Sequence, residues 1–208
     1  MNRPASTIEI PGLIQSRVKR ELVFSEEGLT IKKFLSLRPD IFIPGQSISA
    51  FRFGIQDFYA FKMVYGRQYF IETKDFQNKI SYIKLNSYCG INDKTYYKIW
   101  AEVLQHIWEF YLENQLSYYK ELLNIKQVFE IAGVTFHADG ISWDGENRLR
   151  WNEIVVNTCQ THFTIRHIND PAQFKVCLFS IHWNAVVLQS LLKDIIRHPV
   201  RVHKSSST

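Results

Sequence analysis

Residues 27–31 read Glu-Gly-Leu-Thr-Ile, and residues 139–143 read Asp-Gly-Ile-Ser-Trp. A second matching pair follows, with Ile-Pro-Gly-Gln-Ser-Ile over residues 43–48 and Leu-Arg-Trp-Asn-Glu-Ile over residues 149–154. In each half, a carboxylate and a glycine mark a turn, and apolar residues then resume in the pattern of a strand. The same order of features in both halves predicts a fold unit that is present twice.

The match continues outward, although the distance between matched stretches decreases along the chain. It is 112 and then 106 residues at the two pairs above, 94 residues between 69–71 and 163–165, and 88 residues at the apolar positions of the two helices predicted below. The first copy therefore has the longer loops. The predicted strands are 18–24, 29–34, 41–43, 48–55, 69–71 and 80–85 in the first copy, and 128–131, 134–137, 141–143, 149–158, 162–168 and 174–179 in the second.

Each run of strands is followed by helical spacing of apolar residues. The first predicted helix begins at Asp93, with Asn92 or Asp93 as its N-cap, and continues for about 30 residues, or about 45 Å. Because one small sheet cannot cover that length, its second half, 110–123, must pack elsewhere, either between the two copies or against a partner. The last predicted helix spans 181–197 and is capped by Ser180.

The turn–Gly–apolar strand, the apolar–polar–Ile stretch and the closing helix together resemble the bacterial pleckstrin-homology-like (PH-like) domain. The resemblance implies a mainly β (α+β) fold of two antiparallel half-barrels, each closed by a C-terminal helix. The predicted domains are 8–123 and 127–199, with flexible tails at 1–7 and 200–208. The resemblance to the PH-like domain also implies a scaffold that binds lipid headgroups or peptides and performs no catalysis.

Positive charge is concentrated in the first part of the chain. The whole chain has a formal net charge of +5, and residues 1–92 carry 13 basic against 8 acidic side chains. The densest group comprises Arg17, Lys19, Arg20, Lys32 and Lys33. These cations make an anionic membrane a candidate ligand, although Glu26 and Glu27 in the predicted hairpin turn would repel it. The alternative interpretation of the cluster is a charged edge that protects a strand from association.

Aromatic residues on the long helix indicate a second candidate surface. Trp108 and Tyr119 lie in a half that is apolar on more than one face, which suits either packing inside the protein or contact with a partner. The leading hypothesis is therefore a non-enzymatic intracellular module that binds a protein partner. Peripheral binding to anionic membrane lipids is the alternative, and a homo-oligomer is left open.

Motifs for catalysis, metals and nucleic acids are missing from the sequence. No GxGxxG, GxxxxGK[ST] or GxSxG motif occurs, the seven histidines lack the spacing of metal ligands, and the best RNA-binding match, residues 66–70, is incomplete. We therefore expect no catalytic residue, no metal, no cofactor and no nucleic-acid partner. Three cysteines without a CxxC favour a reducing compartment, and no secretion signal or membrane span is evident. The predicted location is the cytoplasm, with the inner membrane surface as the site of any peripheral contact.

Overall fold

The computed structural model describes residues 3–12, 20–33, 39–145 and 147–198. The chain forms two compact units, Met1–Gln115 and Leu116–Thr208. The division lies inside the long helix, before residue 123, where the first predicted domain ends. Each unit combines antiparallel sheets with helix, so the chain belongs to the mainly β (α+β) class.

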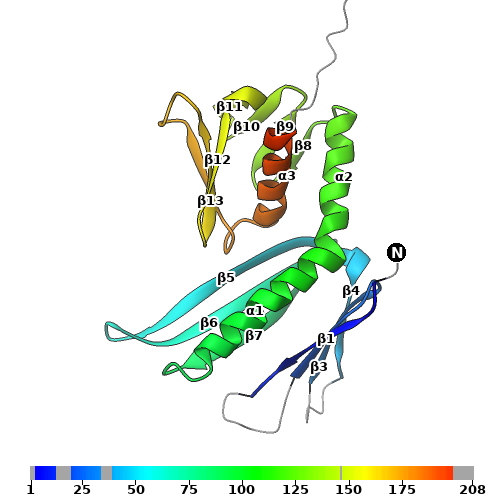
Figure 1. Cartoon of the computed structure of the whole chain (residues 1–208), viewed down its shortest axis with the longest axis vertical. Helices are drawn as coiled ribbons and strands as arrows, with labels where there is room; N and C mark the ends of the chain where they lie inside the picture. Colours follow the sequence, from blue (N-terminus) through cyan, green and yellow to red (C-terminus); the bar gives the residue numbers. More distant parts are fainter. Residues whose placement is uncertain (1–2, 13–19, 34–38, 146, 199–208) are drawn as a thin grey trace, which may run out of the picture. The chain divides into compact units, whose positions relative to one another are not determined.

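The first unit contains a four-stranded sheet, a short 3₁₀ turn, a three-stranded sheet and then a helix (Figure 1). The elements are β1 (Ser6–Ile10), β2 (Arg20–Phe24), β3 (Gly28–Lys33), β4 (Ile41–Pro44), η1 (Gly45–Ser47), β5 (Ile48–Ala60), β6 (Met63–Asp75), β7 (Ile80–Tyr88) and α1 (Asp93–Ile107). The strand orders are β1-β2-β3-β4 and β5-β6-β7. The predicted tail over residues 1–7 is shorter than expected, because Ser6 and Thr7 pair with Phe24 and Val23.

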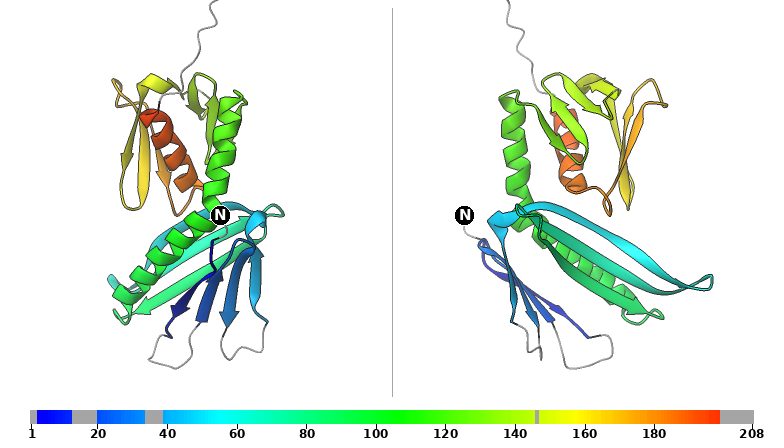
Figure 2. Two further views of the ribbon diagram at one scale, coloured as in Figure 1. Left: turned by 45° about the vertical axis from the view of Figure 1, so that its right-hand side comes forward. Right: turned by 180° about the vertical axis from the view of Figure 1, so that it is seen from behind.

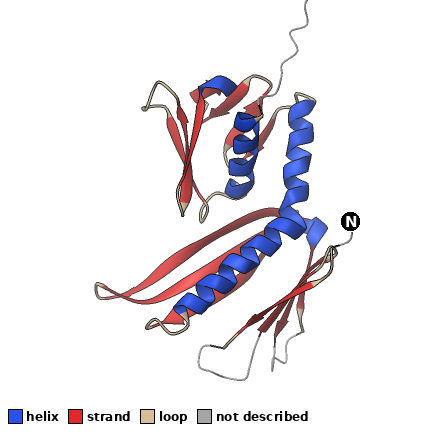
Figure 3. Cartoon of the chain, viewed as in Figure 1, coloured by secondary structure: helices blue, strands red, loops and turns tan. Residues whose placement is uncertain are grey.

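The second unit repeats this order of elements. They are β8 (Phe129–Ile131), β9 (Val134–His137), β10 (Gly140–Trp143), β11 (Asn147–Arg150), η3 (Trp151–Glu153), β12 (Ile154–Thr158), β13 (His162–His167), β14 (Phe174–Leu178) and α3 (Ala185–Arg197). The strand orders are β11-β10-β9-β8 and β12-β13-β14, again antiparallel throughout (Figure 3). The matched sequence stretches thus have matching secondary structure.

A glycine at the same place in each unit allows two strands to lie unusually close. Gly28 pairs with Pro44, and Gly140 pairs with Arg150. A Cβ atom on Gly28 would lie 2.3 Å from the carbonyl oxygen of Ile43, and one on Gly140 would lie 2.0 Å from that of Leu149. No side chain fits at these distances, so both glycines are required by packing against backbone.

The chain leaves the four-stranded sheet through the same turn in both units. After β4 or β11, a three-residue 3₁₀ turn leads directly into β5 or β12. In the first unit the amide of Gly45 donates to the carbonyl of Glu27 at 2.9 Å, and in the second the amide of Trp151 donates to that of Asp139 at 3.3 Å. The prediction of one continuous strand over 149–158 was therefore wrong, because Trp151–Glu153 form this turn.

The helix α1 packs on the three-stranded sheet of its own unit. It contacts β6, β7 and β1 and lies along one face of the β5-β6-β7 sheet (Figure 2). Trp100 is buried and its indole N–H donates to the carbonyl of Phe70 at 3.1 Å. The side chain of Asp93 accepts a hydrogen bond from the Tyr69 hydroxyl at 2.8 Å, so it fixes the start of the helix to β6 rather than capping it.

The helix α3 has the same role in the second unit. It contacts β12, β8 and η3 and buries an apolar face that includes Val187, Leu188, Leu191 and Leu192. The predicted start at residue 181 was wrong, because the helix begins at Ala185, after Asn184 in the left-handed conformation.

The predicted helix of about 30 residues is confirmed, with one change of geometry in its middle. Between α1 and α2 (Glu113–Asn124), residues Trp108–Leu112 form a π turn, η2. There Tyr111 is buried, and its hydroxyl donates to the carbonyl of Ser25 at 3.1 Å. Burial raises the pKa of Tyr111 to about 12, so this donor stays protonated even near pH 10, where an exposed tyrosine titrates. Among the described residues, no helix is long and apolar enough to cross a membrane.

Replacing Gly140 with alanine is expected to lower the free energy of unfolding by about 2 kcal/mol or more, because β10 and β11 would have to separate. Denaturant unfolding followed by circular dichroism measures the loss. The matched control is Gly145→Ala, where φ is +76° but no atom lies within 4 Å of the new Cβ, so the cost is about 1 kcal/mol. Equal losses in the two variants would contradict the close-approach explanation.

The three cysteines are expected to differ in reactivity. Cys89 and Cys159 are exposed thiols, whereas Cys177 on β14 is fully buried and burial raises its pKa to about 11. At about pH 8, Cys177 is therefore protonated as well as inaccessible. A thiol-titrating disulfide reagent should modify two cysteines in the native protein and the third only after unfolding. In a Cys89→Ser/Cys159→Ser variant the native reaction should disappear, and rapid reaction of a third thiol in the wild type would show this assignment to be wrong.

Candidate functional site

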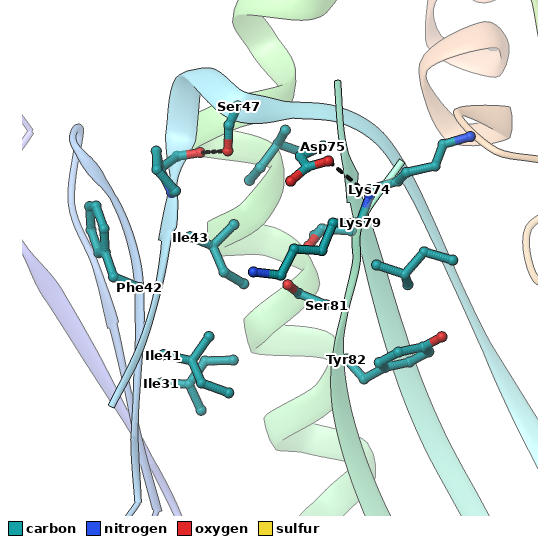
Figure 4. Close-up of a pocket in the computed structure, with 14 residues that line it drawn as sticks. Ile31, Ile41, Phe42, Ile43, Ser47, Lys74, Asp75, Lys79, Ser81 and Tyr82 are labelled. Carbon is teal, nitrogen blue, oxygen red and sulfur yellow. Dashed lines mark hydrogen bonds between the residues drawn. The ribbon is translucent and has the colours of Figure 1, made fainter. Parts of the chain in front are cut away.

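A cavity of about 360 Å³ opens between the two sheets of the first unit (Figure 4). Its walls come from the end of β3, from β4 and the start of β5, and from the end of β6 and the start of β7. The lining residues are Ile31, Ile41, Phe42, Ile43, Pro44, Ser47, Ile48, Thr73, Lys74, Asp75, Lys79, Ile80, Ser81 and Tyr82.

Two strand edges without a neighbouring strand border this cavity. In the described part of the chain, β4 pairs only with β3, and β7 pairs only with β6. The outer edge of such a strand presents backbone N–H and C=O groups that have no partner in the sheet. The cavity therefore combines an apolar interior with backbone groups that can form hydrogen bonds.

The wall on the β4 side is apolar because alternate residues face inward. Figure 4 shows Ile41 and Ile43 on the cavity side of β4, with Ile31 beside them, whereas Phe42 lies on the other side of the strand. Ile31 and Ile43 are buried, and Ile41 is partly exposed at the mouth. This alternation follows from the two-residue period of a strand.

The opposite side is shaped by the turn between β6 and β7. One carboxylate oxygen of Asp75 accepts hydrogen bonds from the amides of Gln77 and Lys79, each at 2.8 Å. Asn78 occupies the left-handed conformation with φ of 63°, which asparagine tolerates. The carboxylate of Asp75 is thus used in fixing the turn, and the turn places the ammonium group of Lys79 between the two strands (Figure 4).

Two serine hydroxyls bond to backbone carbonyls of residues that line the cavity. Ser47 Oγ donates to the carbonyl of Pro44 at 2.7 Å, and Ser49 Oγ donates to that of Lys74 at 2.9 Å. These two backbone acceptors are therefore occupied. The rest of the cavity is bordered by Ile41–Ile43 on one side and by Ile80–Tyr82 on the other.

The structure places only part of the predicted basic cluster. Arg17 and Lys19 lie outside the described residues, as does the side chain of Lys33. Lys32 pairs with Glu21 at 3.4 Å, and a guanidinium N–H of Arg20 donates to the carbonyl of Lys84 on β7 at 3.3 Å. Both described cations thus have partners within the unit.

The expected repulsion by Glu26 and Glu27 is not supported by the strand register. Arg20 pairs with Lys33 at one end of the β2–β3 hairpin, whereas the two glutamates occupy the turn at the other end. Five residue steps at about 3.3 Å each separate the two ends by roughly 16 Å. The carboxylates therefore do not share a site with the cations.

Trp108 and Tyr119 lie in different units. Trp108 is half-buried in η2 of the first unit. Tyr119 packs on Phe129 of β8 with ring centroids 5.4 Å apart, and burial raises the pKa of its hydroxyl. Tyr119 therefore contributes to the second unit's packing, and a joint surface of the two residues stays a prediction.

The histidines that are described do not assemble a metal centre. No group of three or more His, Cys, Asp or Glu side chains with metal-binding geometry occurs among the residues that the structure describes. His106 lies between aromatic rings, 5.1 Å from Phe24 and 6.2 Å from Phe110 by centroid, and Nε2 is 2.8 Å from Ser6 Oγ. It functions as a packing residue of the first unit.

Sequence reasoning missed the cavity because its residues come from two separate stretches of the chain, 31–48 and 73–82. Each lining residue alone is ordinary for a strand or a turn, and nothing in the sequence shows that the two stretches face each other. The one sequence signal was the interruption at Pro44-Gly45, which predicts that β4 ends there without saying what faces its edge.

Comparisons with known proteins found no matching family and only weak structural similarity. The sequence matches no family model, and the search of curated proteins found no match. Among solved structures, the chain is similar to one described as "Structure of the Spt16D Pob3N heterodimer", with 11% sequence identity, a TM-score of 0.25, and coverage of 88% of this chain and 99% of that one. A TM-score this low supports no argument about function.

Proposed function

We propose that the protein is a non-enzymatic binding module made of two PH-like half-barrels, each closed by its C-terminal helix, and that the first unit binds an extended segment of a protein partner. The repeated order of four strands, a 3₁₀ turn, three strands and a helix supports the two-domain interpretation. The equivalent close approaches at Gly28 and Gly140 support it independently.

The two unpaired edges beside one apolar cavity carry this proposal. An extended peptide can add to the edge of β4 or β7 through main-chain hydrogen bonds, while every second side chain enters a pocket. Here the inward side chains would meet Ile31, Ile41 and Ile43 (Figure 4). Main-chain bonding supplies affinity for any extended chain, and the apolar wall selects the residues that enter.

The charge at the mouth adds a preference. Lys79 is exposed and its ammonium group lies between β4 and β7, whereas the carboxylate of Asp75 is held by its own turn. A peptide carboxylate beside the inserted apolar residue would therefore be favoured. We expect the partner segment to combine a branched or aromatic residue with Asp or Glu.

Binding fits this site better than catalysis does. Asp75 is the one carboxylate among the described lining residues, and two backbone amides already occupy it. No described lining residue is a histidine or a cysteine. An intracellular location is part of the proposal, and it is supported by three cysteines that are free thiols.

Selection of a displayed library of random peptides on the full chain tests the proposal. We expect enriched peptides to bind the wild type and to lose affinity by roughly tenfold or more in Ile41→Asp, because the charge would enter the apolar wall. Lys79→Glu should weaken the binding of those enriched peptides that carry a carboxylate.

The matched control is Ile168→Asp, the same substitution at an exposed isoleucine of the second unit. Ile168 is 56% exposed and does not line the cavity, so this variant should keep the affinity of the wild type. Enrichment of no peptide, or equal losses in the Ile41 and Ile168 variants, would overturn the assignment of the cavity.

A further inference from the structure

The hairpin of β5 and β6 continues beyond the sheet to which it belongs. The third strand, β7, ends at Tyr88 opposite Gly66, but β5 and β6 remain paired to Tyr59 with Val64 and to Ala60 with Met63. Residues 58–65 therefore form a two-stranded extension, here called the ribbon, which projects at the end of the unit near the start of α1 (Figure 2). The matching strands of the second unit, β12 and β13, have only five and six residues.

The ribbon exposes large apolar side chains that the fold does not use. The exposed fraction is 103% for Phe61, 75% for Met63 and 66% for Tyr59, and Val64 is also exposed. Burial of such groups is what stabilises a fold, and these groups remain in water. A contiguous exposed apolar surface of this kind marks an interaction site.

Phe61, at the apex of the ribbon, adopts a backbone conformation that costs free energy. Phe61 has φ of +54°, in the left-handed region that favours glycine and disfavours bulky residues. A glycine there would relieve this strain and remove an exposed aromatic ring. The presence of phenylalanine at this point supports a role for the ring outside the folded unit.

The base of the ribbon is rigid. Phe58, Tyr65 and Tyr88 pack with ring centroids 6.0 to 6.3 Å apart. The amide of Cys89 donates to the carbonyl of Tyr65 at 2.8 Å, and Arg67 pairs with Asp57 at 2.7 Å. The apolar tip is thus held at a fixed position, which lowers the entropy lost when it binds.

Exposed lysines lie on the ribbon and on the first turns of α1. Lys62 is at the tip, and Lys94 and Lys98 are exposed on the first turns of α1. The nearby carboxylates of Asp57 and Asp93 both lie close to Arg67, at 2.7 and 3.7 Å. The charge presented beside the apolar tip is therefore positive.

We propose that the ribbon inserts into the interfacial layer of an anionic lipid membrane. Successive residues of a strand point to opposite faces, and the neighbours Met63 and Val64 are both exposed and apolar, so both faces of the ribbon are apolar. A protein groove would cover one face, whereas lipid surrounds an inserted element on every side. The Tyr59 and Tyr65 hydroxyls suit the headgroup level, and Lys62 can extend its ammonium group back to it.

The geometry limits the depth of insertion. The two outer edges of the ribbon carry backbone groups without a sheet partner, and hydrocarbon cannot satisfy them. Insertion is therefore shallow, on the order of 5–10 Å, which matches about three residues of strand. This inference uses neither the cavity nor the groups that line it, so it stands independently of the proposed peptide binding.

Co-sedimentation of the full chain with vesicles tests the inference. We expect binding to phosphatidylcholine vesicles in which roughly one lipid in three is phosphatidylserine, and weaker binding to phosphatidylcholine alone. Phe61→Ser/Met63→Ser should lower partitioning into anionic vesicles by roughly tenfold or more. Lys62→Glu should lower it less.

Phe76→Ser is the matched control, because Phe76 is 77% exposed but lies in the β6–β7 turn rather than on the ribbon. It should bind vesicles as the wild type does. Absence of wild-type binding at low salt, or an equal loss in the Phe76 variant, would overturn the inference. A ribbon variant that binds vesicles normally but no longer self-associates in analytical ultracentrifugation would also overturn it, and would assign the ribbon to a second copy of the chain.

Discussion

The contact between Gly28 and the backbone of Ile43–Pro44 determines the geometry of the first unit. Because no Cβ separates the strands there, β4 lies against β3 up to the residue at which the 3₁₀ turn begins. The amide of Gly45 then bonds back to Glu27, and the chain enters the second sheet at Ile48. Gly140 allows the same arrangement in the second unit, where β11 lies close against β10 and is followed by the 3₁₀ turn. A glycine and a short turn thus connect two sheets into one unit, twice along the chain.

This way of connecting the sheets leaves strand edges uncovered. The chain passes from β4 through the 3₁₀ turn to β5, so among the described strands β4 has no second partner in its own sheet, and β7 is likewise the last described strand of the other sheet. The helix α1 packs on β6, β7 and β1 rather than on β4. The cavity beside Ile41 and Lys79 is therefore a consequence of the topology, and its chemistry is set by the few residues that face it.

The features that depend on local sequence were predictable, and those that depend on tertiary packing were not. The Gly28 and Gly140 strands, the paired 43–48 and 149–154 stretches and the long helix follow from turn residues and periodicity. The ribbon was missed because its apex, Ala60-Phe61-Lys62-Met63, has none of the Gly, Asn, Asp or Pro residues that indicate a turn. The start of the first helix at Asp93 was predicted correctly, whereas the start of α3 was misassigned, because Asn184 adopts a left-handed backbone conformation and makes no side-chain cap.

The cavity and the ribbon of the first unit differ in how much their apolar side chains contribute to the stability of the fold. At the cavity, Ile31 and Ile43 are buried, so the same side chains that would receive a ligand also hold the sheets together. On the ribbon, Phe61 and Met63 are exposed at the tip of a hairpin that extends past β7, and the shorter hairpin of the second unit shows that this fold is complete without such an extension. Exposed apolar residues that contribute no burial, one of which, Phe61, also has a strained backbone, need an explanation outside the folded chain. For that reason the ribbon, more than the cavity, indicates that this unit contacts another surface.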